Sequence, residues 1–173
     1  MHDFALWLYS TKLSVTLQSH SWIVPALQAI HFAAMGVVFS SVFAVAMRLM
    51  GWISLDQTVP ATVRRFAPWF WGALGVMATT GIILTIAEPV RELLSISFRL
   101  KLALIAMGAV LAWSFQRSLL QSDTERSTAL LARPAIRMMI IVYSLMWLAV
   151  AVLGRLIAWE VLVWGHLSPF SQF

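Results

Sequence analysis

The residue with the clearest potential for chemistry is His31, which lies in an uncharged run from Ile23 to Met47. If this run is a membrane-spanning helix, the imidazole lies eight residues from its start, roughly 12 Å deep. An ionisable side chain there is costly and usually faces a bundle interior with a partner or ligand. We therefore expect His31 to bind a metal or cofactor or to handle protons. The alternative is a neutral histidine hydrogen-bonded to a neighbouring helix.

His20 precedes His31 by eleven residues. On a continuous helix the two imidazoles would share one face and stand about 16 Å apart along the axis. That separation is too great for both to bind one metal ion, so His20 is expected to serve a second centre or to be an interfacial histidine in water. His2 and His166 lie near the ends of the chain and are weaker candidates.

Lys101 begins a short apolar segment, since only 15 uncharged residues separate it from Arg117. Its ammonium is expected either to snorkel to the outer membrane surface or to point inward at an anion. Arg99 lies beside it in the sequence. Lys101, and Thr80 and Gly81 late in the second apolar run, lie in the same outer half of the membrane as His31, and a glycine there would let a helix or a flat ligand approach closely.

The nine methionines suggest copper, because thioethers are soft ligands for Cu(I). Met35 follows His31 by one helical turn, which places the pair on one face. Methionine also fills gaps in apolar packing, and the single Met-x-x-Met, Met47 to Met50, lies at the far edge of the span. Copper binding at His31 with Met35, and separately at His20, as stepping sites is therefore an alternative prediction.

The composition places these residues in a membrane. Of 173 residues, 61% are hydrophobic and 11% are charged, which is too apolar for a soluble domain. There is no cysteine, so disulfides and cysteine-ligated clusters are excluded. The net charge of +5 does not indicate nucleic acid, because most basic residues flank apolar runs, where they suit lipid headgroups.

The apolar runs predict a single all-α domain, an integral membrane four-helix bundle, because helices satisfy their backbone hydrogen bonds within lipid. The predicted spans are 22–48, 66–87, 98–119 and 135–158. Residues 4–17 are too short and polar to span. They are expected to form an interfacial amphipathic helix or a helix packed on the bundle.

The distribution of Lys and Arg predicts the orientation in the membrane. The segments after the first and third spans hold seven of these residues, and the other side holds five. Since cytoplasmic segments carry the excess of positive charge, both termini are expected outside the cytoplasm. The first residues show no basic region followed by a cleavable apolar core, so we expect the first span itself to act as the targeting signal.

Short motifs along nearly the whole chain resemble those of an uncharacterised group of bacterial four-span membrane proteins. They are Ser21-Trp22-Ile23-Val24-Pro25, Leu27-Gln28-Ala29-Ile30-His31-Phe32, Arg48-Leu49-Met50-Gly51, Pro68-Trp69, Thr80-Gly81 and Phe98-Arg99-Leu100-Lys101-Leu102. The group often has an acidic residue two positions before the arginine, whereas this chain has Ala46 there. A charge pair with Arg48 is therefore not expected.

This group is similar in layout to the copper resistance D membrane domain, which also pairs a first-helix histidine with Thr-Gly and a later Lys-Leu. It looks more distantly like the membrane protoporphyrinogen oxidases, in which a histidine and a lysine in comparable helices are associated with haem. The resemblance implies a metal- or haem-linked function in the bacterial inner membrane.

Three functions follow from these observations. The leading hypothesis is a haem b-binding protein that transfers electrons or anchors an oxidoreductase, with His31 as axial ligand and Lys101 or Arg99 near a propionate. The second is copper transport or tolerance, and the third is a structural or assembly subunit. All three favour a non-catalytic subunit within a homo-oligomer or a larger membrane complex, because four short helices enclose little volume.

Overall fold

The protein is described by a computed structural model that covers residues 2–53, 56–120 and 134–168. Its elements, in chain order, are α1 (His2–Tyr9), α2 (Lys12–Ser19), α3 (Ile23–Leu49), α4 (Val59–Ala87), α5 (Pro89–Leu94), α6 (Ile96–Leu120), α8 (Pro134–Leu156), η1 (Ile157–Trp159), α9 (Glu160–Trp164) and η2 (Gly165–Leu167). The candidate membrane spans among the described residues are α3, α4, α6 and a helical segment that begins with α8, four in all. The predicted all-α, four-span fold is confirmed.

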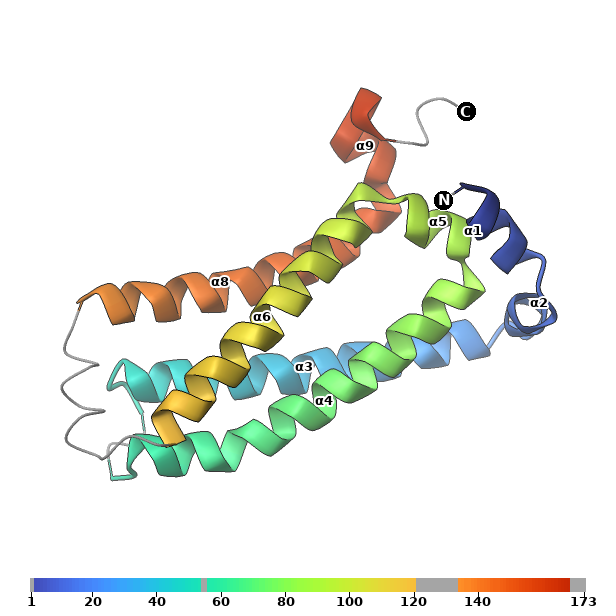
Figure 1. Cartoon of the computed structure of the whole chain (residues 1–173). Coiled ribbons are helices and arrows are strands. Elements are labelled where there is room, and N and C mark those ends of the chain that lie inside the picture. Colours follow the sequence, from blue (N-terminus) through green and yellow to red (C-terminus); the bar gives the residue numbers. More distant parts are fainter. Residues whose placement is uncertain (1, 54–55, 121–133, 169–173) are drawn as a thin grey trace.

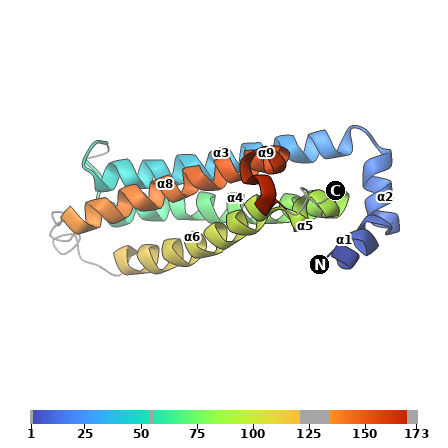
Figure 2. The same cartoon turned by 90° about the horizontal axis from the view of Figure 1, so that it is seen from above.

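The four long helices alternate in direction along the chain (Figure 1). The helix α3 packs mainly against α4, and α6 packs mainly against α8. The short helices α1, α2, α5 and α9 all lie at one end of the bundle (Figures 1 and 2). We call it the α5 end, and the end at which α3 is joined to α4 the opposite end.

The helix α4 starts at Val59, seven residues before the predicted span that begins at position 66. The sequence contains the signals for this earlier start. Thr58 caps the helix by accepting a hydrogen bond from the N–H of Ala61, and a proline stands in the first turn, where its missing N–H costs nothing. The basic pair Arg64 and Arg65 therefore lies on a helix rather than in the connection.

The N-terminal segment forms two short helices rather than one. The helix α1 packs on α5, and α2 packs on α4 and α3. Ala5 and Ser14 are fully buried by this packing, and the side-chain amide of Gln18 donates a hydrogen bond to the carbonyl of Ala87 at 2.9 Å. Of the two arrangements expected for this segment, the structure adopts the packed one.

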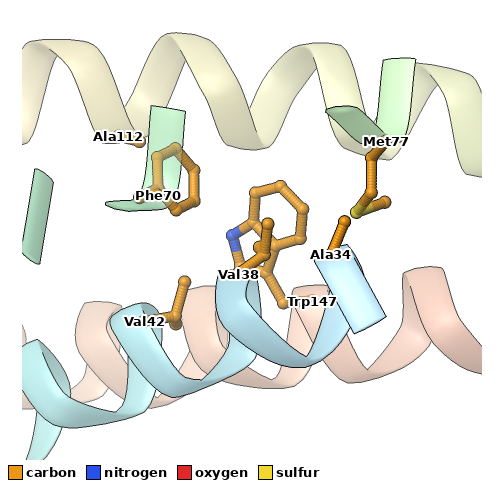
Figure 3. Close-up of a cluster of buried hydrophobic side chains, with 7 residues drawn as sticks. All are labelled: Ala34, Val38, Val42, Phe70, Met77, Ala112 and Trp147. Atoms are coloured by element: carbon orange, nitrogen blue, oxygen red, sulfur yellow. The ribbon is translucent and has the colours of Figure 1, made fainter. Parts of the chain in front are cut away.

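The centre of the bundle is an apolar cluster to which all four long helices contribute (Figure 3). Its members are Ala34, Val38, Val42, Phe70, Met77, Ala112 and Trp147. Trp147 is the largest fully buried side chain, and its ring meets that of Phe70 edge to face at 5.5 Å between centroids, a favourable arrangement for aromatic rings. This cluster holds the two helix pairs together.

Gly108 allows α6 to approach α8 beside this cluster. A Cβ atom added there would lie 2.7 Å from Cε of Met146 and 3.1 Å from Cζ2 of Trp147. We expect Gly108→Ala to lower the free energy of unfolding by about 1–3 kcal/mol through overpacking, measured by thermal unfolding in detergent. Gly72→Ala is the matched control, because a Cβ at Gly72 meets nothing within 4 Å. Equal stability of the two variants would contradict the prediction.

Candidate functional site

The imidazole of His31 is held by a hydrogen-bond relay between α3 and α4. Its Nδ1 lies 2.8 Å from Oγ1 of Thr80, and the Thr80 hydroxyl donates to the carbonyl of Val76 at 2.8 Å. When the hydroxyl gives its one hydrogen to that backbone carbonyl, its oxygen accepts from Nδ1–H of His31. In this arrangement a neutral imidazole carries its proton on Nδ1 and has its lone pair on Nε2.

The surroundings of His31 come mainly from the same turn of α4. Thr80 is buried and His31 is half-buried. A Cβ atom added to Gly81 would lie 3.5 Å from Cε1 of His31, an ordinary van der Waals contact, so the ring lies directly against the glycine. The space beside Gly81 is therefore occupied by the imidazole of His31.

Lys101 projects from α6 towards the α5 end. Its Cδ would lie 3.7 Å from a Cβ added to Gly154 of α8, and its ammonium stands 5.3 Å from the ring centroid of Phe98, one turn earlier on α6. The positive charge of Lys101 acts on both His31 and Glu92. The side chain of Lys101 thus lies along neighbouring protein groups. Its positive charge interacts electrostatically with His31.

Glu92 of α5 is an acidic group close enough to Lys101 for their charges to interact. Its side chain is 14% exposed and lies 3.8 Å from the Arg91 guanidinium. Burial raises the pKa of Glu92, and the charges of Lys101 and Arg91 offset this only in part. The signal available in the sequence was the cation inside a short span, which requires a nearby anion.

This raised pKa predicts how stability depends on pH. Between the usual glutamate pKa and the raised one, the folded protein binds more protons than the unfolded chain, so stability falls as pH rises. We expect the melting temperature of the wild type to drop, relative to Glu92→Gln, as pH increases from about 4 to about 7. Parallel melting curves for the two proteins across that range would refute the prediction.

Two of the expected site residues lie apart from His31. The helix is not continuous between the histidines, because α2 ends at Ser19 and α3 begins at Ile23, so the expected shared face is wrong. His20 is exposed and directly follows the last residue of α2. Its Nδ1 lies 3.0 Å from the carbonyl oxygen of Thr16. Arg99 is exposed and donates to the carbonyl of Leu93 at 3.3 Å.

The sulfur side chains near His31 belong to the apolar core. Met35 packs against the central cluster, and Met77 is a buried member of it. Met107 on α6 is 48% exposed. Among the described residues there is no group of three or more His, Cys, Asp or Glu that could hold a metal ion. His31, Thr80 and Gly81 thus form the candidate site, with Lys101 acting on it electrostatically.

Arg48, at the opposite end, has a partner although the acidic residue is missing from its helix. Its guanidinium donates from both Nε, at 3.0 Å, and Nη2 to the carbonyl of Gln57. A backbone carbonyl in the α3–α4 connection thus satisfies the arginine in the absence of an acid at Ala46.

Comparison with known proteins identifies the family to which this chain belongs. A family model described as a family of unknown function, DUF6644, matches residues 14–160. This range includes His31, Thr80, Gly81 and Lys101. A search of curated proteins and a search of solved structures each returned no match.

Proposed function

We propose that this chain, which belongs to the DUF6644 family of unknown function, binds b-type haem in the bacterial inner membrane with His31 as an axial ligand. The observation that supports the proposal is the relay from His31 to Thr80 and Val76. A metal-binding histidine usually donates its other ring N–H to a fixed acceptor, which sets its tautomer and orientation. The relay provides that acceptor on Nδ1.

The donor set fits haem better than it fits a caged metal ion. Haem brings four of its own ligands, so one or two axial side chains are enough. A bare metal ion requires about four protein ligands or their equivalents, and the described residues contain no group of three or more His, Cys, Asp or Glu that could hold one. Met35, the expected copper partner of His31, packs against the apolar core.

Haem would supply one-electron transfer, and the protein would tune it. The charge of Lys101, which already acts on His31, would stabilise an anionic propionate or favour the reduced iron. A second axial ligand from another copy of the chain would make the protein a homo-oligomer, and a larger oxidoreductase would supply the electron donor or acceptor.

The proposal is tested by the absorption spectrum of the purified protein, as isolated and after reduction, together with haem and copper analysis. A Soret band with at least one haem for every two chains is expected. Copper in stoichiometric amount without a Soret band would replace the proposal with copper transport of the copper resistance D type. Neither haem nor copper after expression with adequate supply would favour a structural subunit.

A further inference from the structure

The half of the bundle away from α5 contains a cavity of about 310 Å³ that all four long helices line. Its walls are mainly apolar, with aromatic rings from α4, α6 and α8 and a few polar side chains. The residues that matter here are Ser41, Phe66, Phe70, Phe115, Gln116 and Tyr143. Ser41 follows His31 by ten residues on α3, or about 15 Å along the axis, so this cavity is separate from the candidate haem site.

The orientation of one polar side chain in the wall is fixed. Trp71 of α4 donates its indole N–H to Oε1 of Gln116 on α6 at 2.9 Å. An indole nitrogen can only donate, so the amide oxygen of Gln116 must be the atom that faces it. Gln116 is half-buried and lines the cavity, and its amide NH₂ is a double donor with no hydrogen-bond acceptor identified in the described part of the chain, so it is available to an occupant of the cavity.

The remaining polar groups of the wall have partners of their own. The Ser41 hydroxyl donates to the carbonyl of Val37 at 2.9 Å, and the Tyr143 hydroxyl donates to that of Gly108 at 3.3 Å. The cavity therefore offers one strong donor, from Gln116, within a wall of aromatic rings. An occupant that fits is flat, apolar and carries an acceptor oxygen.

We propose that this cavity binds an isoprenoid quinone from the bilayer, with a ring carbonyl accepting a hydrogen bond from Gln116. A quinone ring is flat enough to lie against Phe66 and Phe115, and its tail is as apolar as the surrounding lipid. A pocket of this volume lies at the lower end of the range for small-molecule sites, ~300–1,000 Å³.

Other occupants from the membrane match the cavity less well. One turn of a helix, ~10 Å across and 5.4 Å long, already fills about 420 Å³, so a helix of a second copy exceeds the space. An acyl chain fits by volume but has no acceptor. It would leave the Gln116 amide in hydrocarbon without a hydrogen bond, which is unfavourable.

The test measures equilibrium binding of a benzoquinone with a ten-carbon tail to the protein in quinone-free nanodiscs. Quenching of tryptophan fluorescence is the readout. Saturable quenching is expected. Decylbenzene, which has the same tail and a ring without carbonyls, should compete only at a concentration at least about tenfold higher. Quenching that rises without saturation, or equal competition by decylbenzene, would overturn the proposal.

Three variants locate the binding. Gln116→Leu keeps the approximate size and should weaken binding roughly 3- to 10-fold. Ala67→Phe, from the cavity wall, should weaken it at least about tenfold by filling the space. Val110→Phe is the control, because Val110 is 65% exposed on α6, and should bind like the wild type. Unchanged binding by a folded Ala67→Phe, or by Gln116→Leu if the former does not fold, would refute the site.

The claim is independent of the proposed haem. Quinone binding should be retained in His31→Ala, because His31 does not line the cavity. A wild-type protein that lacks a Soret band but binds quinone would therefore overturn only the first proposal, and one that has a Soret band but does not bind quinone would overturn only the second.

Discussion

Replacing His31 by alanine is expected to abolish the haem absorbance of the purified protein while the bundle remains folded. An axial ligand contributes more to metal affinity than an outer hydrogen-bond partner, whose loss typically costs roughly 10- to 100-fold. The cost in folding should be small, about 1 kcal/mol, because Thr80 keeps its bond to Val76 when the imidazole is removed. Haem content per chain and circular dichroism of the same sample measure the two effects.

Thr80→Val separates a ligand role of His31 from a purely structural one. Valine has nearly the shape of threonine but cannot accept the Nδ1–H, so haem affinity should fall by roughly 10- to 100-fold with binding still detectable. If His31 only fixes α3 to α4, His31→Leu should be as stable as the wild type, and neither substitution should change haem content. Haem retained at wild-type level in both His31→Ala and His31→Leu would exclude the ligand role.

The fold was predictable because the bilayer imposes strong constraints on sequence. A spanning helix requires about 20 apolar residues, and the long uncharged runs in this sequence are compatible with few structures other than such helices. Boundaries were less predictable, because capping is local. Thr58 and the proline after Val59 extend α4 well before its apolar run begins. The break between α2 and α3 carries no proline or glycine at positions 20 to 22, so the sequence did not decide whether the helix is continuous from His20 to His31.

The candidate site was predictable only in part. Helical depth placed His31, Thr80 and Gly81 in the same half of the membrane, and the structure places them in contact. Depth says nothing about rotation between helices, however, so it could not show that Thr80 rather than a ligand faces Nδ1. The cavity near Gln116 was not anticipated at all, since it arises from residues on four helices that share no motif.

The two proposed sites lie in opposite halves of one bundle. His31 is eight residues from the start of α3, whereas the cavity is lined by the last third of that helix. A haem near the α5 end and a quinone near the opposite end would place two redox groups on the two sides of a membrane. The central cluster around Trp147, which lies between them, would then set their separation.

Replacing Glu160 by alanine is expected to destabilise the α5 end more than any other polar substitution considered. Glu160 is 4% exposed, and its carboxylate accepts hydrogen bonds from the Ser95 hydroxyl at 2.9 Å and from the N–H of Ile96 at 2.5 Å. Ile96 begins α6, so the negative charge also complements the dipole of that helix. The loss should be about 2–4 kcal/mol, measured as the free energy of unfolding in detergent.

Glu160 could instead act through an ion pair with a neighbouring cation, and substitutions distinguish the two roles. Glu160→Gln keeps an acceptor oxygen for Ile96 or Ser95, so it should recover about half of the stability that alanine loses. Arg155→Gln removes the cation nearest to Glu160 in the sequence and should cost less than about 1 kcal/mol. If Arg155→Gln were as damaging as Glu160→Ala, the carboxylate would be acting through charge pairing rather than by capping α6. Local unfolding at that end should increase in Glu160→Ala and stay unchanged in Arg155→Gln. It can be measured by hydrogen exchange of the α6 amide groups.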